Sequence, residues 1–330
     1  MNSTDNSSFG VVVIGRNEGE RLRRCLSSVS NATGSIVYVD SGSTDGSVEL
    51  ALSMRAEVVA LDMHIPFTAA RARNAGFDRL RRLLPNARFV QFVDGDCELV
   101  EGWLCSAAAF LSLHAQIACV CGRLRERFPE LSVYNRLCDI EWDRPVGETH
   151  ACGGIAMMRA AALVDVGGFR EDMVAGEEPE LCVRLRGHGF KVWRLALPMA
   201  WHDAAMLRFG QWWTRSKRTG FSYAQRISVQ NGGVERDLIS QALRAWMWGA
   251  ALPLAAILGW IGWGTPALLL LLGYPLQVLR LAARAEGAWQ VRRERAFFVV
   301  LGKFPELLGL LQFWLGRRRA QAARAFDYKS

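Results

Sequence analysis

Short apolar runs alternate with amphipathic segments over the first hundred residues of the chain. Runs rich in β-branched and aromatic residues predict strands, which we place at Gly10–Ile14, Ile36–Val39, Glu57–Leu61 and Phe89–Val93. Apolar positions at helical spacing lie between them, as in the segment from Leu22 to Val29 and in Phe67–Leu84. This alternation predicts an α/β fold with a mostly parallel, Rossmann-like sheet flanked by helices.

The pattern changes character toward the C-terminus. Residues 245–279 include no charged side chain, a run too long for one membrane span and interrupted midway by Gly264 and Pro266. We therefore predict a helical hairpin at about 245–281 and an interfacial amphipathic helix at about 296–315. The expected domains are a catalytic domain at 1–240 and a membrane-associated helical region at 241–330. The alternative is that these segments form a soluble helical subdomain.

Charge and cysteine usage narrow the choice of partners. The formal net charge of +8 fits either nucleic acid or an anionic membrane surface. The arginines gather beside the apolar C-terminal segments and no nucleic-acid motif accompanies them, so we expect a membrane and no nucleic acid. Basic residues flank both ends of the hairpin, which predicts that both ends face the cytoplasm. Eight cysteines without a Cys-x-x-Cys pair are typical of reduced core residues.

The fourth predicted strand ends in Asp94-Gly95-Asp96, two carboxylates separated by one glycine. Ligands of open α/β sheets bind beyond the carboxyl ends of the strands. Two acidic groups at that place would repel each other unless a cation lay between them, and Mg²⁺ or Mn²⁺ prefers such oxygen ligands. The alternative is a surface turn, because Asp-Gly-Asp is also common turn chemistry.

Two further carboxylates, Glu18 and Asp40, follow the first and second predicted strands. In a parallel sheet these loops share one edge with Asp94 and Asp96, which predicts a single site. The sequence has neither Gly-x-Gly-x-x-Gly nor a P-loop, so metal and arginine would have to neutralise any bound phosphate.

A glutamate pair and a histidine complete the candidate chemistry. Glu177 and Glu178 precede a proline at the start of a predicted helix, where they either cap the helix or provide a general base. His202 is either a core residue or a metal ligand.

The chain resembles a family-2 glycosyltransferase of the GT-A fold over about residues 10–225. Six motifs in the family's order carry this resemblance: Val11-Val12-Val13-Ile14-Gly15-Arg16-Asn17-Glu18, Val39-Asp40-Ser41-Gly42-Ser43-Thr44-Asp45-Gly46, Ala70-Arg71-Ala72-Arg73-Asn74-Ala75-Gly76, Val93-Asp94-Gly95-Asp96, Gly167-Gly168-Phe169 and Glu177-Glu178-Pro179-Glu180-Leu181. It implies an inverting transfer of sugar from a nucleotide-diphosphate donor, with Mn²⁺ or Mg²⁺.

The resemblance also implies roles for individual residues. The donor nucleotide would contact Arg16, Glu18, Asp40, Ser43, Arg73, Asn74 and Asp94. Asp94, Asp96 and His202 would hold the metal. Glu178 takes the position where the family often has aspartate as catalytic base, with Glu177 as the rival. We expect Gly153, Gly154, Arg215 and Arg218 on the acceptor or diphosphate side.

The acceptor is then expected to be lipid-linked or close to the membrane, in glycan or polysaccharide assembly at the cytoplasmic membrane. A processive polysaccharide synthase and a non-catalytic nucleotide-sugar-binding scaffold are the alternatives. One predicted hairpin is too little to form a polymer channel, and the retained carboxylates argue against a scaffold.

Overall fold

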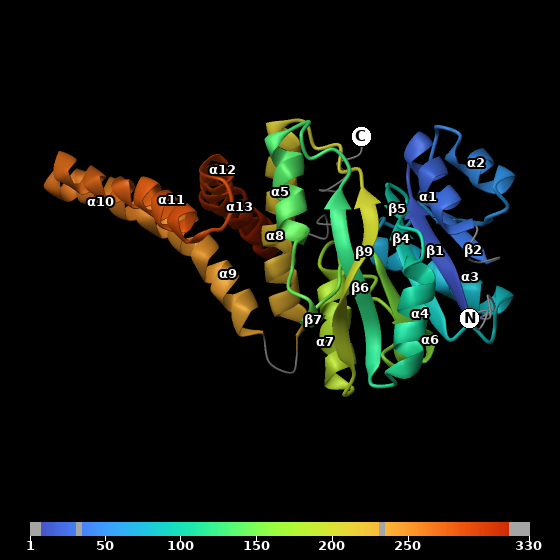
Figure 1. The fold of residues 1–330 in the computed structure, drawn as a ribbon. Coiled ribbons are helices and arrows are strands. Elements are labelled where there is room, and N and C mark those ends of the chain that lie inside the picture. The colour runs from blue at the N-terminus through green and yellow to red at the C-terminus, as the bar shows by residue number, and fades with distance from the viewer. Residues whose placement is uncertain (1–7, 31–34, 231–234, 317–330) are drawn as a thin grey trace. The chain divides into compact units, whose positions relative to one another are not determined.

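The structure is a computed structural model that describes residues 8–30, 35–230 and 235–316. The chain divides between Ala205 and Met206 into two compact units (Figure 1). The first unit is an α/β domain and the second is helical. The predicted functional boundary at residue 240 stays a prediction, because a division into compact units does not show where catalysis resides.

A mixed nine-stranded sheet forms the centre of the first unit. The strands are β1 (Phe9–Gly15), β2 (Ile36–Asp40), β3 (Glu57–Ala60), β4 (Phe89–Asp94), β5 (Cys97–Leu99), β6 (Ile117–Glu126), β7 (Gly147–Glu148), β8 (Ala156–Arg159) and β9 (Lys191–His202). Their order is β3-β2-β1-β4-β8-β6-β9-β5, and β7 pairs with β9. The N-terminal four strands are parallel to one another, and β8 runs antiparallel to β4.

The strand register brings the predicted acidic loops to one edge. Asp40 is paired with Gly15 across β1 and β2, and Asp94 is paired with Ile14 across β1 and β4. The carboxyl ends of β1, β2 and β4 therefore lie side by side. Glu18 follows β1 by three residues, so its loop opens on the same edge.

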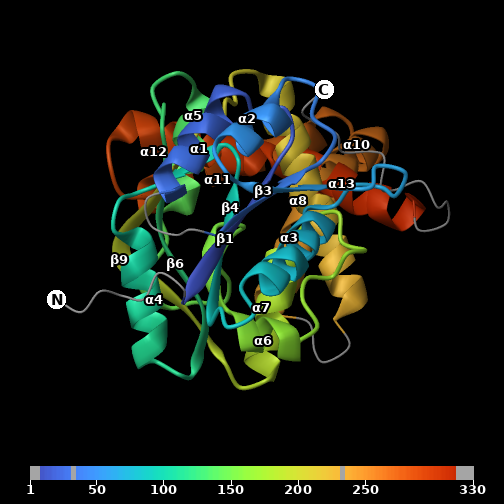
Figure 2. The same ribbon diagram turned by 90° about the vertical axis from the view of Figure 1, so that its right-hand side faces the viewer.

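Helices cover both faces of this sheet (Figure 2). They are α1 (Glu20–Ser30), α2 (Ser47–Ser53), α3 (Ala69–Leu83), α4 (Trp103–Leu113), α5 (Val133–Trp142), α6 (Ala160–Asp165) and α7 (Glu177–Gly187). Adjacent residues of β4 show the two faces, because side chains alternate along a strand. Gln91 accepts a hydrogen bond from Trp103 of α4, whereas Phe92 packs against Phe77 of α3 and edge-on against Phe169.

The predicted α/β class and the four N-terminal strands are confirmed. The sequence pattern also predicts a short strand at Lys191–Arg194; this is the start of β9, which continues to His202. No strand was predicted at β6, although β6 and β9 pair along their whole length. Register shifts in that pair break the regular alternation on which such a prediction depends.

The second unit consists of helices alone among its described residues. They are α8 (Phe209–Val229), α9 (Arg236–Trp246), a π-helical segment (Met247–Ala251), α10 (Leu252–Trp263), a 3-10 segment (Thr265–Leu272), α11 (Gly273–Arg284), α12 (Trp289–Leu301) and α13 (Lys303–Gly316). In the described parts of the chain, three continuous helices are long and apolar enough to cross a membrane: Arg236–Trp263, Thr265–Arg284 and Trp289–Gly316.

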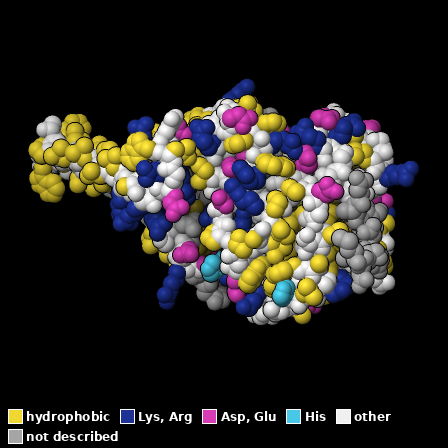
Figure 3. Space-filling model, in the orientation of Figure 1, with side chains coloured by type: hydrophobic (Ala, Val, Ile, Leu, Met, Phe, Trp, Pro, Cys, Tyr) yellow, Lys and Arg dark blue, Asp and Glu magenta, His cyan; other side chains and the backbone are white. Residues whose placement is uncertain are grey.

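The predicted hairpin corresponds to the first two of these helices, which turn at Gly264 with a positive φ of 78°. Hydrophobic side chains cover the hairpin on the face shown in Figure 3. Ile261 and Trp263 near the turn are 74% and 84% exposed, far more than large apolar side chains tolerate in water over a continuous surface.

The third helix packs closely on α8 through two glycines. A side chain at Gly220 would overlap the backbone of Glu306, and one at Gly309 would overlap the backbone of Lys217. Helices approach this closely only where small residues face each other. The predicted interfacial placement of 296–315 stays a prediction, since this segment is also long enough to span. The three arginines Arg317-Arg318-Arg319, whose positive charge predicts contact with anionic lipid headgroups, lie outside the described residues.

Candidate active site

The loop after β2 is shaped by Asp40. Its Oδ2 accepts hydrogen bonds from the backbone N–H groups of Gly42 and Ser43 at 2.9 and 3.0 Å, and its Oδ1 accepts one from the Tyr38 hydroxyl at 3.1 Å. Burial raises the pKa of Tyr38, and a hydrogen bond with Ser43 lowers it. The net effect is a rise, so the hydroxyl keeps the proton that it donates to Asp40. Asp40 thus fixes the backbone of the loop in which donor-binding residues were predicted.

The loops after β1 and β2 are bonded to each other. Ser43 Oγ accepts from the backbone N–H of Asn17 at 2.9 Å, and Asn17 Oδ1 accepts from that of Thr44 at 2.8 Å. Arg16, the remaining predicted donor contact here, lies half-buried directly before Asn17. The two loops therefore form one unit at the sheet edge.

Glu18 is the buried carboxylate of the segment that follows β1. Its side chain is buried and pairs with Arg21 at 2.8 Å. A Cβ at Gly95 would lie 3.1 Å from Glu18 Cγ and 3.3 Å from the Ile14 carbonyl oxygen. The glycine between Asp94 and Asp96 thus leaves room for the close approach of Glu18 and β1, where a larger residue would press against both.

Arg73 of α3 joins three carboxylates. Its Nη2 lies 3.0 Å from Asp94 Oδ1, and its Nη1 lies 2.8 Å from Glu177 Oε1 and 3.1 Å from Glu178 Oε1. The guanidinium is 3% exposed. Burial alone would lower its pKa, but the surrounding carboxylates outweigh this effect and raise it, so Arg73 stays charged. The structure thus brings together one predicted donor contact, one predicted metal ligand and both candidate bases.

Gly154 closes this cluster. An added Cβ there would overlap Arg73 Nη2 and would lie 3.0 Å from Glu178 Oε1 and 3.1 Å from Asp94 Oδ2. Its neighbour Gly153 is different, because a Cβ there would meet no described atom within 4 Å. Of the two glycines predicted on the acceptor side, only Gly154 touches the cluster.

The two glutamates at the start of α7 differ in their surroundings. Glu177 is buried, with 4% of its side chain exposed, and accepts a hydrogen bond from Arg73. Glu178 is 17% exposed, and burial together with the charge of Glu177 raises its pKa to about 7, in spite of Arg73. A carboxyl group with this pKa can both accept and release a proton near neutrality.

Asn74 faces the turn that precedes α7. Its Nδ2 donates to the Phe169 carbonyl oxygen and to Glu171 Oε1, both at 2.9 Å, and its Oδ1 accepts from the Phe169 backbone N–H at 2.9 Å. A Cβ at Gly168 would lie 2.8 Å from the same Oδ1, and Gly168 has φ +70°. Asn74 therefore ties α3 to the Gly167-Gly168-Phe169 turn; its predicted nucleotide contact stays a prediction.

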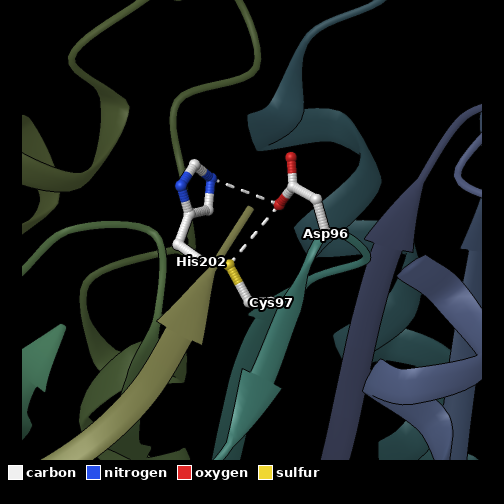
Figure 4. Close-up of side chains that lie close together, drawn as sticks. All are labelled: Asp96, Cys97 and His202. Carbon is white, nitrogen blue, oxygen red and sulfur yellow. Dashed lines mark hydrogen bonds and ion pairs between the residues drawn. The ribbon is translucent and has the colours of Figure 1, made fainter. Parts of the chain in front are cut away.

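Asp96 lies with His202 and Cys97 in a second group (Figure 4). His202 Nε2 is 3.4 Å from Asp96 Oδ1, and the Cys97 thiol donates to the same oxygen at 3.4 Å. Burial, followed by the charges of Asp96 and Asp94, raises the pKa of Cys97, so it stays a thiol. The ligand atoms of all three residues lie within 4.8 Å of one another.

Two residues that the sequence analysis missed surround His202. Glu126 Oε2 is 3.8 Å from His202 Nδ1, and the Trp142 ring stands perpendicular to the imidazole with centroids 4.8 Å apart. Burial lowers the pKa of His202, but Asp96 and Glu126 outweigh it and raise it to about 10. Glu126 lies beside His202 because β6 pairs with β9 in this register, and no local pattern in the sequence predicted that pairing.

The donor set of this group fits a divalent cation such as Mn²⁺. Carboxylate and imidazole are ligands that Mn²⁺ accepts, and a histidine ligand commonly has a carboxylate beyond its second nitrogen. Asp94, the third predicted ligand, uses one oxygen for Arg73. Arg215 and Arg218 lie on α8 of the second unit, and their predicted acceptor role stays a prediction.

Residues 10–167 match the family model described as glycosyl transferase family 2. No sequence among curated proteins matches the chain.

Solved structures resemble it over a wider range. The mannosyltransferase PcManGT from Pyrobaculum calidifontis, in complex with GDP-Man and Mn²⁺, has a TM-score of 0.63 at 17% identity, over 93% of this chain and 87% of that one. GalNAc-T7 with UDP, GalNAc and Mn²⁺ has a TM-score of 0.54 at 16% identity, over 76% and 52% of the two chains. TarS from S. aureus has a TM-score of 0.51 at 15% identity, over 92% and 55%.

The sheet, its acidic edge and these likenesses define a GT-A fold. Residues 10–167 match the model of family-2 glycosyltransferases, and helices long and apolar enough to span a membrane follow later in the chain.

Proposed function

We propose that the protein is a metal-dependent, inverting glycosyltransferase that moves a sugar from a nucleotide-diphosphate sugar to an acceptor at the membrane. The observation that carries this proposal is the cluster of Arg73 with Asp94 and Glu178, which adjoins Asp96 at the carboxyl end of β4. It combines a candidate base with candidate cation ligands at the edge where α/β sheets bind their ligands.

Glu178 is the proposed general base. It would take the proton of the acceptor hydroxyl while that oxygen attacks the anomeric carbon on the face opposite the leaving diphosphate, so the configuration inverts. The raised pKa of Glu178 supports this role, as does its greater exposure relative to Glu177. Arg73 then holds the base in place, and Glu177 holds Arg73.

Asp96 and His202 would hold the divalent cation, with Asp94 on the side of Arg73. When bound, such a cation offsets the negative charge that develops on the leaving diphosphate. The interlocked loops after β1 and β2 would receive the nucleotide, with Asp40 fixing the backbone of Gly42 and Ser43. Arg16, Glu18 and Asn74 are the further donor contacts proposed. The Mn²⁺ and nucleotide named for PcManGT and GalNAc-T7 support this arrangement.

The acceptor is proposed to be lipid-linked or otherwise close to the membrane, as in glycan or polysaccharide assembly. Three candidate spanning helices support membrane attachment. Arg244 and Arg284 flank the hairpin, which favours cytoplasmic placement of its ends and hence of the catalytic domain. We place Gly153, Arg215 and Arg218 on the acceptor side.

A panel of nucleotide sugars, each with and without Mn²⁺, tests the proposal by thermal shift. A cognate donor stabilises the folded protein by mass action, and only when Mn²⁺ is present. Transfer or donor hydrolysis is then measured for the wild type, Asp96→Ala and Glu178→Gln. We expect Asp96→Ala to lose the Mn²⁺-dependent stabilisation, and Glu178→Gln to keep it within a few-fold while losing turnover.

Two outcomes would contradict the proposal. If no nucleotide sugar stabilises the protein in the presence of Mn²⁺, the donor site is wrong. If a donor stabilises the wild type but is neither transferred nor hydrolysed, the non-catalytic scaffold is the better description.

A further inference from the structure

The register of the sheet places a buried carboxylate directly beside His202. Glu126, the last residue of β6, is the Cα partner of His202, the last residue of β9. Its Oε2 lies 3.8 Å from His202 Nδ1, while Asp96 Oδ1 lies 3.4 Å from Nε2 on the other side of the ring. The imidazole therefore stands between two carboxylates, one of which belongs to the proposed cation site.

Glu126 is held rigidly where it is. Its side chain has no exposed surface. Oε1 accepts from the backbone N–H of Phe128 at 3.2 Å and from Asn135 Nδ2 at 3.3 Å, and Oε2 accepts from the backbone N–H of Ala204 at 3.1 Å. A buried carboxylate with this many hydrogen-bond donors is fixed in orientation. Its Oε2 is the oxygen that lies beside His202 Nδ1.

A third contact limits rotation of the ring. Trp142, at the end of α5, meets the imidazole at 90° with centroids 4.8 Å apart. Its carbonyl oxygen accepts a hydrogen bond from Arg194 Nη2 of β9 at 2.9 Å. The tryptophan is thus tied to the same strand as the histidine.

We propose that Glu126 is a positioning residue for His202. It accepts the Nδ1 proton of the imidazole, so that Nε2, once a bound cation has displaced its own proton, would turn its lone pair toward Asp96 and the cation. The 3.8 Å separation between Glu126 Oε2 and His202 Nδ1 has to close to about 3 Å for this hydrogen bond to form. This inference rests on the proposed function, since it takes Asp96 and His202 to be cation ligands. Such carboxylates beyond a ligating histidine fix its tautomer and orientation.

The experiment measures binding of Mn²⁺ alone, from the electron paramagnetic resonance signal of the free ion, in the full-length protein. The variants are Glu126→Gln, His202→Ala and the two combined. We expect Glu126→Gln to weaken Mn²⁺ binding about 10- to 100-fold. In the His202→Ala background the same change should have less than about a twofold effect, because residues that act through one another are not additive.

A control variant and a spectroscopic readout separate positioning from general loosening. Asp139→Asn disturbs the junction of α5 with β6, because Asp139 Oδ1 accepts a hydrogen bond from the Glu126 backbone N–H at 3.0 Å. Asp139 itself makes no contact with the imidazole. It should leave Mn²⁺ affinity within about twofold of the wild type. The nitrogen coupling of bound Mn²⁺, seen by electron spin echo, should be present in the wild type and lost in Glu126→Gln. Glu126→Asp, which keeps the charge but withdraws it from Nδ1, replaces Glu126→Gln if that variant does not fold.

The outcomes are distinguishable. Unchanged affinity in Glu126→Gln, or equal weakening with and without His202, overturns the positioning role and leaves the cation site standing. If the wild type binds no Mn²⁺, or if His202→Ala binds it as well as the wild type, the assignment of the cation ligands fails first and the positioning role fails with it.

Discussion

Nη1 of Arg73 lies 3.1 Å from Oε1 of Glu178, within a cluster where one guanidinium faces three carboxylates. One positive charge cannot offset three negative ones. The least costly adjustment is for one carboxyl group to hold its proton more tightly, and Glu178 is the group whose pKa rises, to about 7. The same imbalance of charge gives Glu178 the pKa that its proposed role as a base at neutral pH requires.

The pH dependence of transfer should follow Glu178. Below its pKa the carboxyl group is protonated and cannot accept the acceptor proton, so kcat/KM should rise with pH through about 7 and then level off. Steady-state rates between pH 5.5 and 9 with saturating Mn²⁺ provide the measurement. A profile that stays flat through neutrality would show that the raised pKa does not govern the reaction.

Glu178→Gln should also stabilise the fold, more at pH 8 than at pH 5. Because the folded-state pKa is raised, Glu178 favours the folded state below its unfolded pKa, and this contribution is lost as pH rises through about 7. Glutamine does not ionise, so its advantage appears at the higher pH. We expect about 1–2 kcal/mol at pH 8, reduced from the full shift because the side chain is 17% exposed.

Thermal unfolding at the two pH values measures this difference. Glu148→Gln is the matched control, because Glu148 pairs with Lys191 on the surface and exposed pairs contribute little. A melting temperature of Glu178→Gln that is no higher than that of the wild type at pH 8 would contradict the strain inferred for the cluster.

Replacing Arg73 should destabilise the domain strongly. Arg73→Met leaves three carboxylates around an uncharged side chain, and removal of one partner from a buried ion pair costs about 3–5 kcal/mol. Arg73→Lys keeps the charge but loses the fork that reaches Asp94 and Glu177 together, so it should fall between Arg73→Met and the wild type. Arg79 lies on the same helix as Arg73 and forms an exposed pair with Glu57, so Arg79→Lys should change stability by less than about 1 kcal/mol. Chemical unfolding of the three variants tests this order.

Gly154→Ala and Gly153→Ala form a second matched pair. A methyl group at position 154 would displace Arg73 and press against Glu178 and Asp94, whereas one at position 153 meets no described atom within 4 Å. We expect Gly154→Ala to lower kcat by at least about tenfold, since small displacements of positioned groups are costly to catalysis. Gly153→Ala should stay within about threefold. Equal rates for the two variants would mean that the cluster adjusts without loss.

The sequence allowed the edge of the sheet to be predicted because local signals were enough there. Strong β-branched runs end at Asp40 and Asp94, and parallel pairing then puts their loops together. The surroundings of His202 could not be predicted in the same way. Glu126 and Trp142 approach it only through the pairing of β6 with β9, whose register shifts are set by tertiary packing. The contact of Arg73 with both glutamates likewise depends on how α3 and α7 pack.

The helical hairpin of the second unit should insert into a bilayer. Its side chains near the turn are largely exposed and apolar, and helices in hydrocarbon satisfy their own backbone groups. The full-length protein should therefore resist extraction by high salt and alkaline carbonate and be released by detergent.

Leu258→Asp places a charge on an exposed face of α10, where Leu258 is 66% exposed in the wild type. The charge costs about 2.5–3.5 kcal/mol if that face meets lipid. It should move part of the protein into the carbonate-soluble fraction, while Leu52→Asp, at a similarly exposed position on α2 of the first unit, should not. Release of the wild type by salt alone would instead assign these helices to a soluble helical subdomain.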